Sequence, residues 1–218
     1  MAIVITGANR GIGRALLDHY RSQGETVYGT CRGDLPEDDH WIALDVTRPG
    51  GFAHLAERLD SVPVDLLVCN AGVYLDRGMK LATEYPPEVW AQSFAVNVTG
   101  VFLTVQALLP NLQMADTAKI AILSSAMGSS ERAPGKSYAY RASKAAVTNL
   151  ARNLATDLEP LGIAVGVYHP GWVQTSMGGP DADLSVADSV AGLSARIDAL
   201  SLATTGAALL YDGTPMPF

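Results

Sequence analysis

The chain has 218 residues, of which 48% are hydrophobic and 17% are charged, and its formal net charge at pH 7 is -7. This length and hydrophobic content suit one large core, so we expect a single domain over residues 1–218. The acidic balance, without a cluster of Lys and Arg, argues against a nucleic-acid surface, because a phosphate backbone is bound by clustered cations.

Apolar strand-like residues begin at position 2, which leaves no room for a signal peptide. No apolar run approaches the roughly 18 residues that span a bilayer, so we expect a cytoplasmic protein without a membrane partner. Cys31 and Cys69 lie at the ends of apolar runs and form no CxxC pair, which indicates buried free thiols. The histidines show no HExxH or paired spacing, and GxSxG is absent, so neither a metal site nor a serine hydrolase is expected.

Short apolar runs alternate with helical patterns along the whole chain. The expected strands cover residues 2–6, 26–30, 41–44, 65–69, 119–124, 163–168 and 207–211. The expected helices lie near residues 11–23, 50–60, 87–112, 138–158 and 184–199. Strands that are apolar on both faces and are joined by helical crossovers predict a Rossmann-like, doubly wound α/β fold. Its seven-stranded parallel sheet would carry helices on both faces.

Three glycines follow the first expected strand, in the stretch TGANRGIG at 6–13. A helix N-terminus offers unpaired N–H groups and a positive dipole end, and Gly7, Gly11 and Gly13 would let a pyrophosphate approach the backbone closely. A tight turn without a ligand is the alternative, because the spacing is GxxxGxG rather than GxGxxG. The position after the first strand of an alternating chain favours the dinucleotide site.

Tyr140 and Lys144 lie four residues apart in a helical pattern, so both side chains emerge on one face. A phenol with a pKa of about 10 is a poor base at neutral pH, and a neighbouring ammonium group would lower that pKa. Tyr140 could then exchange a proton with a carbonyl or alcohol oxygen. The alternative is an amphipathic surface helix that carries a Tyr and a Lys.

Six motifs together resemble the short-chain dehydrogenase/reductase family. They occur in its order and spacing over nearly the whole chain: TGANRGIG at 6–13, NAG at 70–72, NVTG at 97–100, SSAMG at 124–128, YAYRASK at 138–144 and HPGWVQT at 169–175. The details of the last two motifs, the short chain and the terminal YDGTPMPF look most like the small C-factor and sniffer-like carbonyl reductase branch.

The resemblance implies four catalytic residues: Asn97, Ser125, Tyr140 and Lys144. Ser124 competes with Ser125, but the family pattern has a serine three residues before a glycine, here Gly128. Ser125 would hold the substrate oxygen, and Lys144 would also bind the nicotinamide ribose. Asn97 would hold a water that links Lys144 to solvent, whereas a polar surface residue or a local helix distortion is the alternative. The spacing between Ser125 and Tyr140 is slightly long and indicates an enlarged loop near the substrate.

The same resemblance implies the cofactor contacts. The adenine would lie against Asp45 and Val46, and the segment from Pro170 to Thr175 would approach the nicotinamide and pyrophosphate. Simple turns or a helix cap are the alternatives for these segments. The expected contacts are Gly7, Asn9, Arg10, Gly11, Ile12, Gly13, Arg32, Asp45, Val46, Asn70, Ala71, Gly72, Tyr140, Lys144, Pro170, Gly171, Val173 and Thr175.

The choice of cofactor follows from charge at the end of the second strand. An acidic residue there would bind the ribose 2′-OH of NAD, but this position is Cys31, and Arg32 comes next. Arg10 supplies a second guanidinium group, so NADP(H), with its 2′-phosphate, is favoured. Asp34 leaves NAD(H) possible.

These observations predict an NADP(H)-dependent oxidoreductase that interconverts a small carbonyl compound and its alcohol, with Tyr140 as the proton donor or acceptor. The alternative is a dinucleotide-binding signalling or regulatory protein with little turnover. Residues 178–199 are predicted to form a mobile loop and helix near the substrate. The resemblance also implies a homodimer or homotetramer, paired through the helices that carry Asn97 and Tyr140.

Overall fold

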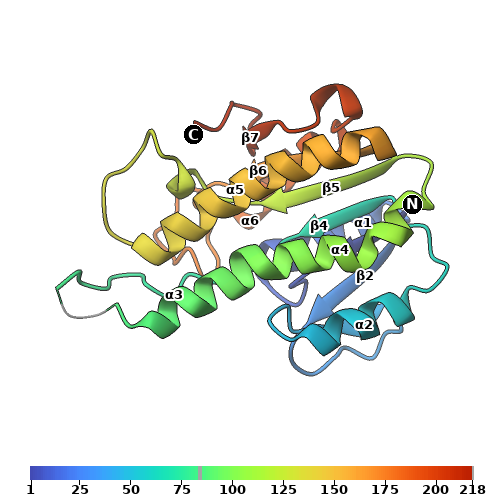
Figure 1. Ribbon diagram of the computed structural model, residues 1–218, viewed down its shortest axis with the longest axis horizontal. Coiled ribbons are helices and arrows are strands. Elements are labelled where there is room, and N and C mark those ends of the chain that lie inside the picture. The colour runs from blue at the N-terminus through green and yellow to red at the C-terminus, as the bar shows by residue number, and fades with distance from the viewer. Residues whose placement is uncertain (83–84, 218) are drawn as a thin grey trace.

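The computed structural model describes residues 1–82 and 85–217, and one parallel sheet lies at its centre (Figure 1). Within these residues the sheet has seven strands in the order β3-β2-β1-β4-β5-β6-β7. The strands are β1 (Ala2–Ile5), β2 (Thr26–Cys31), β3 (Trp41–Ala43), β4 (Leu66–Cys69), β5 (Ala118–Leu123), β6 (Ile163–His169) and β7 (Ala208–Leu210). The predicted Rossmann-like fold is confirmed.

Helices cover both faces of the sheet. On one face, α1 (Gly11–Ser22) and α6 (Val186–Asp198) pack against each other and the strands. On the other face lie α2 (Pro49–Arg58), α4 (Gly100–Gln113) and α5 (Tyr138–Leu158). Each layer has its own apolar core, because successive strand residues point to opposite faces. Val4 belongs to the core beneath α4 and α5, whereas its neighbours Ile3 and Ile5 belong to the core beneath α1 and α6.

The strand order reverses beside β1, which is where a doubly wound sheet opens a crevice for ligands. Strand β1 pairs with β2 on one side, with Ile3 opposite Val27, and with β4 on the other, with Ile3 opposite Leu66. Because all strands run parallel, the segments that follow β1, β2 and β4 emerge at the same edge of the sheet.

The helix predicted near 87–112 is not regular. It begins as α3 (Pro87–Phe94), continues through a π-helical segment at Ala95–Thr99 and ends as α4. A π-helical turn inserts an extra residue and often occurs at functional sites. The buried residues of this segment are Val96 and Asn97, so the local helix distortion considered for Asn97 is present.

The same continuous stretch, Pro87–Gln113, has the length and composition of a helix that could cross a membrane, with a mean hydropathy of 1.5 in its most apolar window. The prediction that no apolar segment is long enough to span a bilayer was therefore wrong. In that window 44% of the residues are buried, and Val105, Leu108 and Leu112 belong to the core beneath α4 and α5. A core helix passes the same test of length and composition.

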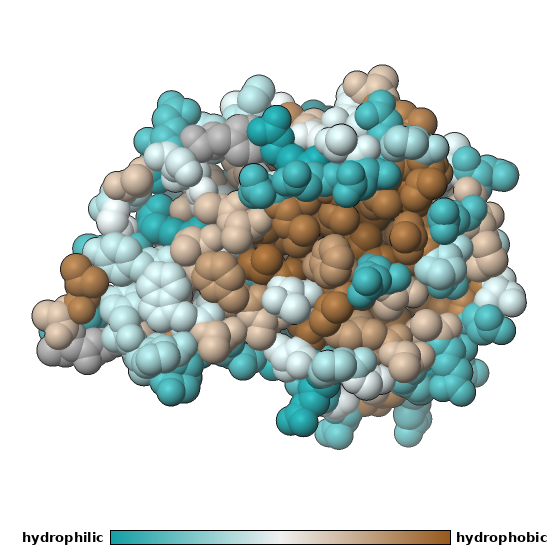
Figure 2. Space-filling model, in the orientation of Figure 1, coloured by the Kyte–Doolittle hydropathy of each residue, from teal (hydrophilic) through white to brown (hydrophobic). Residues whose placement is uncertain are grey.

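The outer side of α4 and α5 remains apolar. Figure 2 shows a continuous hydrophobic area in the middle of the face that carries these two helices. Phe102 on α4 is 40% exposed, and partly buried Leu103, Leu109, Leu150 and Leu154 come from the same two helices. An exposed apolar area of this kind is typical of a surface that meets another protein.

Candidate active site

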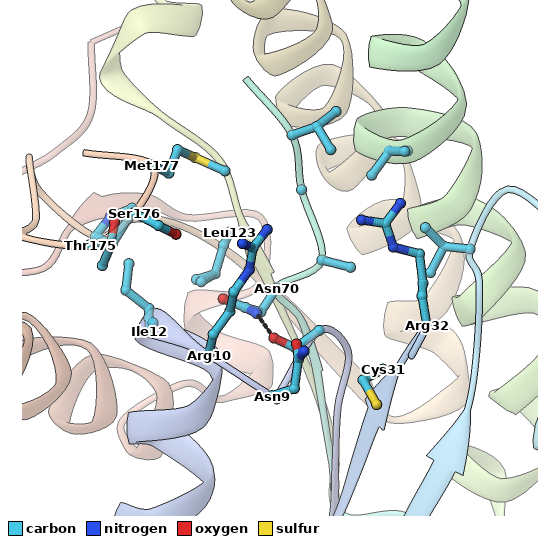
Figure 3. Close-up of a pocket in the computed structure, with 18 of the residues that line it drawn as sticks. Asn9, Arg10, Ile12, Cys31, Arg32, Asn70, Leu123, Thr175, Ser176 and Met177 are labelled. Carbon is cyan, nitrogen blue, oxygen red and sulfur yellow. Dashed lines mark hydrogen bonds between the residues drawn. The ribbon is translucent and has the colours of Figure 1, made fainter. Parts of the chain in front are cut away.

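A cavity of about 400 Å³ lies at the carboxyl ends of the central strands (Figure 3). The segments that follow β1, β2, β3, β4 and β6 form most of its wall, and the π-helical segment, the end of β5 and α5 complete it. The lining residues are 7, 9–12, 31–33, 44–46, 70–73, 96, 123–124, 140, 144, 170 and 175–177.

Most of the predicted cofactor contacts lie in this wall. They are Gly7, Asn9, Arg10, Gly11, Ile12, Arg32, Asp45, Val46, Asn70, Ala71, Gly72, Tyr140, Lys144, Pro170 and Thr175. Three others, Gly13, Gly171 and Val173, are not among the residues that line the cavity.

Gly13 is needed where the glycine turn packs closely against the segment after β4. The Asn70 side chain donates hydrogen bonds to the carbonyl oxygens of Thr6 (2.8 Å) and Gly7 (3.0 Å). A Cβ atom at Gly13 would collide with this amide and lie 2.5 Å from the Gly7 carbonyl oxygen. Gly7 and Gly11 have φ values of 65° and 57°, which favour glycine. The Asn70 side chain, itself in the cavity wall, and Gly13 therefore fix the shape of the turn.

Gly171 and Val173 shape the loop that follows β6. Gly171 has a φ of 90°, and Val173 is buried and forms a bridge with Leu184. Beside that bridge, the Gln174 amide donates to the Leu184 carbonyl (2.9 Å). These contacts tie together the base of the predicted substrate loop and present Thr175 to the cavity.

Arg10 and Arg32 form one charged end of the cavity. In Figure 3, Arg10, which precedes α1, lies between segment 175–177 and Arg32, which follows Cys31 at the end of β2. Both side chains are exposed, and neither forms a hydrogen bond or ion pair with another residue in the described part of the chain. Two available guanidinium groups beside a helix N-terminus fit a phosphorylated ligand.

Asp45 keeps a negative charge near this end. Burial raises the pKa of Asp45, but hydrogen bonds from Thr47 and the charges of Arg32 and Arg48 outweigh burial, so the pKa lies below its usual value. Thr47 donates to Asp45 through its hydroxyl (2.7 Å) and its amide (3.0 Å). The carboxylate is thus held in place by its own turn.

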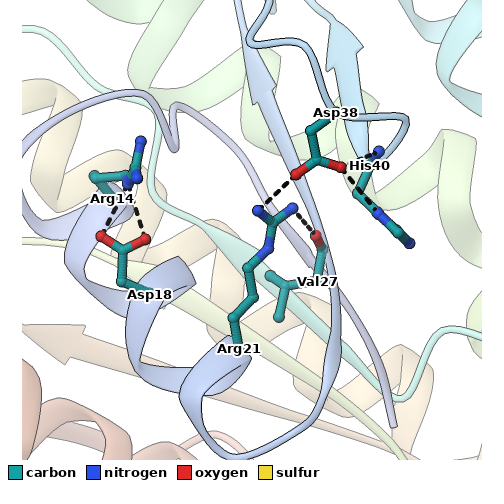
Figure 4. A network of polar contacts seen from close by, with 6 residues as sticks. All are labelled: Arg14, Asp18, Arg21, Val27, Asp38 and His40. Atoms are coloured by element: carbon teal, nitrogen blue, oxygen red, sulfur yellow. Dashed lines mark hydrogen bonds and ion pairs between the residues drawn. The ribbon is translucent and has the colours of Figure 1, made fainter.

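The loop that begins with Arg32 is anchored at its far end (Figure 4). Arg21 on α1 pairs with Asp38 at 2.7 Å and donates to the Val27 carbonyl at 3.0 Å. Hydrogen bonds from the His40 amide and ring, together with Arg21, lower the pKa of Asp38 to about 2. The loop is therefore joined to α1 at neutral pH.

Tyr140 and Lys144 form the other end of the cavity. Both are 7% exposed, and the Lys144 Nζ lies 5.8 Å from the centroid of the Tyr140 ring, in agreement with the predicted shared helix face. Lys144 donates a hydrogen bond to the Leu123 carbonyl at the end of β5 (2.8 Å).

The structure corrects the predicted electrostatics of this pair. Burial raises the pKa of Tyr140 to about 12, and burial lowers the pKa of Lys144 to about 8. Desolvation disfavours the charged form of each group, and it outweighs their mutual influence while Lys144 bonds to a backbone carbonyl. The neighbouring side chain that lowers the Tyr140 pKa is Ser125.

The two serines after β5 have different partners. Ser124 Oγ bonds to the Lys144 carbonyl (3.1 Å) and to Thr148 Oγ1 (2.7 Å), so it joins the strand to α5. Ser125 Oγ accepts from the Met127 amide (3.1 Å) and interacts with Tyr140. Ser124 lines the cavity and Ser125 does not, but the Ser124 hydroxyl is bonded to α5 whereas Ser125 lies next to Tyr140, so the role of Ser125 in holding a substrate oxygen stays a prediction.

Asn97 connects three segments behind the cavity. Its side-chain oxygen accepts from the Val73 amide (2.9 Å), and its Nδ2 donates to the Val73 carbonyl (2.9 Å) and to Ser143 Oγ on α5 (3.0 Å). The side chain is therefore occupied by protein partners, and its predicted role in holding a water stays a prediction.

Sequence reasoning missed several wall residues. Those within two positions of a predicted site residue could have been found by extending the predicted segments: Gly33, Leu44, Val73, Val96, Leu123, Ser176 and Met177. Cys31 and Ser124, which were considered from the sequence but not assigned to the site, also line the cavity. In the described residues, no group of three or more His, Cys, Asp or Glu side chains is placed to hold a metal ion.

The family profile for short chain dehydrogenases matches residues 1–183. The chain belongs to the short chain dehydrogenase family. This membership confirms the predicted family and identifies the protein as a relative of oxidoreductases.

Three similar proteins represent the predicted branch of the short chain dehydrogenases. C-signal of Myxococcus xanthus is 41% identical over 160 residues, which cover 72% of this chain and 93% of that protein. The NADPH-bound carbonyl reductase from chicken fatty liver has a TM-score of 0.88 and 30% identity, with 100% of this chain and 98% of the other covered. Carbonyl reductase Sniffer of D. melanogaster has a TM-score of 0.90 and 26% identity, with coverages of 100% and 99%.

Proposed function

We propose that this short chain dehydrogenase is an NADP(H)-dependent carbonyl reductase, which interconverts a small carbonyl compound and its alcohol. The observation that carries the proposal is the pairing of two ends in one cavity. Tyr140 and Lys144 lie at one end, with Ser125 next to Tyr140 but not itself in the cavity wall, and the glycine turn with Arg10 and Arg32 lies at the other.

The wall residues fit a phosphorylated dinucleotide. The turn after β1 and the N-terminus of α1 would hold the pyrophosphate, and Arg10 and Arg32 would hold a 2′-phosphate beside uncharged Cys31. Similarity to a carbonyl reductase solved with NADPH supports this choice. NAD(H) is the second possibility, with Asp34 near the same strand end.

The side chains at the buried end suit proton transfer to a carbonyl oxygen. A pKa of about 12 keeps Tyr140 protonated at neutral pH, so its hydroxyl can donate a proton to that oxygen. Ser125 would hold the same oxygen by a hydrogen bond and stabilise the charge that develops on it. Lys144 supplies a positive charge beside both. When bound, NADPH supplies the hydride that adds to the carbonyl carbon.

A screen of aldehydes and ketones, followed by NADPH absorbance, tests this proposal. We expect oxidation of NADPH that depends on the carbonyl compound and is abolished in Tyr140→Phe. Consumption of NADPH that is equal in the wild type and in Tyr140→Phe would contradict it.

The similarity to C-signal favours a second candidate, a dinucleotide-binding signalling protein with little turnover. Such a protein would need the glycine turn but would not need the Tyr140–Lys144 pair. Tight NADPH binding by calorimetry, together with no turnover in the carbonyl screen, would support this candidate over the reductase.

We also propose that the protein forms a homodimer through the apolar outer side of α4 and α5. Phe102 and its partly buried neighbours on these helices support this surface (Figure 2). Light scattering would show the mass of a dimer, or of a tetramer if a second surface also pairs. In Phe102→Asp the mass should fall towards that of a monomer, and an unchanged mass would contradict this surface.

A further inference from the structure

A buried carboxylate lies against the start of α5, outside the cavity wall. Asp76, in the segment after β4, is 0% exposed, although an isolated buried charge is unfavourable. Its Oδ2 accepts hydrogen bonds from the amides of Ala139 (2.8 Å) and Tyr140 (3.4 Å). Its Oδ1 is buried and has no hydrogen-bond partner in the described part of the chain.

Helix α5 depends on this carboxylate because it does not cap its own N-terminus. The residue at the cap position, Ser137, has left-handed φ and ψ values of 50° and 46°, and its side chain forms no capping hydrogen bond. The first amides of a helix have no partner inside the helix, and Ala139 is 0% exposed. A carboxylate at this positive end of the helix dipole satisfies these amides and is itself stabilised.

The same segment also holds the ring of Tyr140. The Tyr74 ring stacks on the Tyr140 ring, with centroids 4.3 Å apart and planes inclined by 20°. The Tyr74 hydroxyl shares a 2.6 Å hydrogen bond with Ser137 Oγ. Tyr140 is therefore held at its ring face and at its backbone amide by residues two positions apart.

The segment after β4 that carries Tyr74 and Asp76 is itself held in place by Asn97. Asn97 bonds to both the amide and the carbonyl of Val73, and it also bonds to Ser143 on α5. These hydrogen bonds join the segment that carries Tyr74 and Asp76 to α5 and restrict its movement relative to that helix.

We propose that Asp76 is a positioning residue for Tyr140: its carboxylate fixes the first turn of α5 and, with Tyr74, sets the place of the phenol in the cavity. The inference rests on the proposed function, in which the Tyr140 hydroxyl donates the proton. It assigns a role in turnover to a residue that does not line the cavity.

The charge of Asp76 should also affect the pH profile of kcat, which provides a second measurement. The groups that influence the phenol are Asp76 and Tyr74 from the segment after β4, Ser125 from the end of β5, and Lys144 from α5. Burial is the largest cause of the raised pKa of Tyr140, and the neighbouring Tyr74 and Asp76 raise it further. Replacing the carboxylate by an amide should therefore move the Tyr140 limb of the pH profile of kcat to lower pH.

Three variants test the proposal. Asp76→Asn keeps an oxygen that can accept from Ala139 but removes the charge, whereas Asp76→Ala removes both. Asp65→Ala is the matched control, because the Asp65 carboxylate accepts from the backbone amide of Ala2 (2.7 Å), away from Tyr140. Each protein is measured for kcat, for KM of NADPH and of the best carbonyl substrate, and for the pH profile of kcat.

In Asp76→Ala we expect kcat to fall by about ten- to a hundredfold, since small misplacement of a reacting group has effects of this size. The KM for NADPH should stay within about twofold, because the charged end of the cavity is untouched. Asp76→Asn should restore most of kcat with the shifted pH profile, and Asp65→Ala should keep the wild-type kcat. Wild-type kcat in Asp76→Ala would overturn the proposal. Equal losses of kcat and dinucleotide affinity in both Asp76 variants would also overturn it, because they would indicate a general structural role.

Hydrogen exchange separates this proposal from the proposed function. The Ala139 amide should exchange faster in Asp76→Ala than in the wild type, Asp76→Asn or Asp65→Ala, whether or not a substrate is known. If the wild type turns over no carbonyl compound, the reductase proposal fails, and unchanged exchange in Asp76→Ala would overturn the contact by itself.

Discussion

The two ends of the cavity are built in different ways. At the charged end, Arg10 and Arg32 are exposed, and their side chains form no hydrogen bond with other described residues. At the buried end, Tyr140 and Lys144 are each 7% exposed, and surrounding groups hold both of them. Exposed cations can adapt to a ligand and contribute to affinity, whereas buried and fixed groups set reaction geometry. Substitutions at the two ends should therefore change different kinetic constants.

The largest effect should come from Tyr140→Phe, which keeps the ring stacked on Tyr74 and removes the proton. We expect kcat to fall by about a hundred- to ten-thousandfold, the usual contribution of a positioned proton donor. The affinity for NADPH should persist, as calorimetry can show. Tyr138→Phe, on the same helix turn, is the control, and comparable losses of kcat in both variants would remove the distinction between the two ends.

Arg32→Ala tests the charged end. A charge-assisted hydrogen bond contributes about 1.5–3 kcal/mol, so KM for NADPH should rise about ten- to a hundredfold. The KM for NADH should change much less, and Cys31→Asp should move the preference further towards NADH. The measurement is kcat/KM for both cofactors at fixed salt, because salt screens such contacts.

Arg14→Ala is the control for Arg32→Ala, because Arg14 is paired with Asp18 on the surface of α1 (Figure 4). If the wild type prefers NADH, or if Arg32→Ala weakens both cofactors equally, Arg32 does not select the 2′-phosphate.

His169, a buried histidine, should make the free energy of unfolding depend on pH. Its Nδ1 has no partner among the described residues, and burial lowers its pKa to about 4, with Lys144 and Arg132 lowering it further and Asp212 opposing them. The unfolded chain binds this proton near pH 6.5, so stability should fall as pH drops from 6.5 towards 4. We expect a loss of about 1–2 kcal/mol from this group.

Urea unfolding between pH 7 and pH 4.5 measures this loss of stability. The decrease should be smaller in His169→Asn and unchanged in His54→Asn, whose side chain is 48% exposed. The same decrease in the wild type and in His169→Asn would contradict the assignment.

The smallest effect should come from Arg77→Ala. Arg77 combines the exposure of the arginines at the charged end with the hydrogen bonding of the residues at the buried end. Arg77 is exposed, yet it donates to the carbonyls of Met177 (2.8 Å) and Gly178 (3.2 Å), and Met177 lines the cavity. Exposed hydrogen bonds contribute little, so KM for the carbonyl substrate should rise about two- to tenfold with little change in kcat. A fall in kcat with constant KM would place Arg77 with the buried group instead.

The sequence predicted the sheet and the glycine turn from local signals, whereas most of the other wall residues were predicted from the resemblance to the short-chain dehydrogenase/reductase family. Apolar strands with turn residues at their ends place the glycine turn and Asp45 at one edge of a parallel sheet. The roles of Gly13 and Asn70 depended on packing between segments far apart in the chain. The pKa of Tyr140 depended on burial, which the spacing to Lys144 does not show. Asp76 belongs to no periodic pattern, so only the folded chain reveals its contact with α5.

The strand order also governs when the dinucleotide site can form during synthesis. Strand β1 is central, yet its partner β4 begins at Leu66, so a ribosome must release more than half of the first hundred residues before β1 is flanked on both sides. The glycine turn then acquires its support from Asn70, and the loop with Thr175 arrives much later. Parallel pairings between distant segments form slowly and leave apolar edges open meanwhile. The nascent amino-terminal half should therefore be a substrate for chaperones before it can bind any nucleotide.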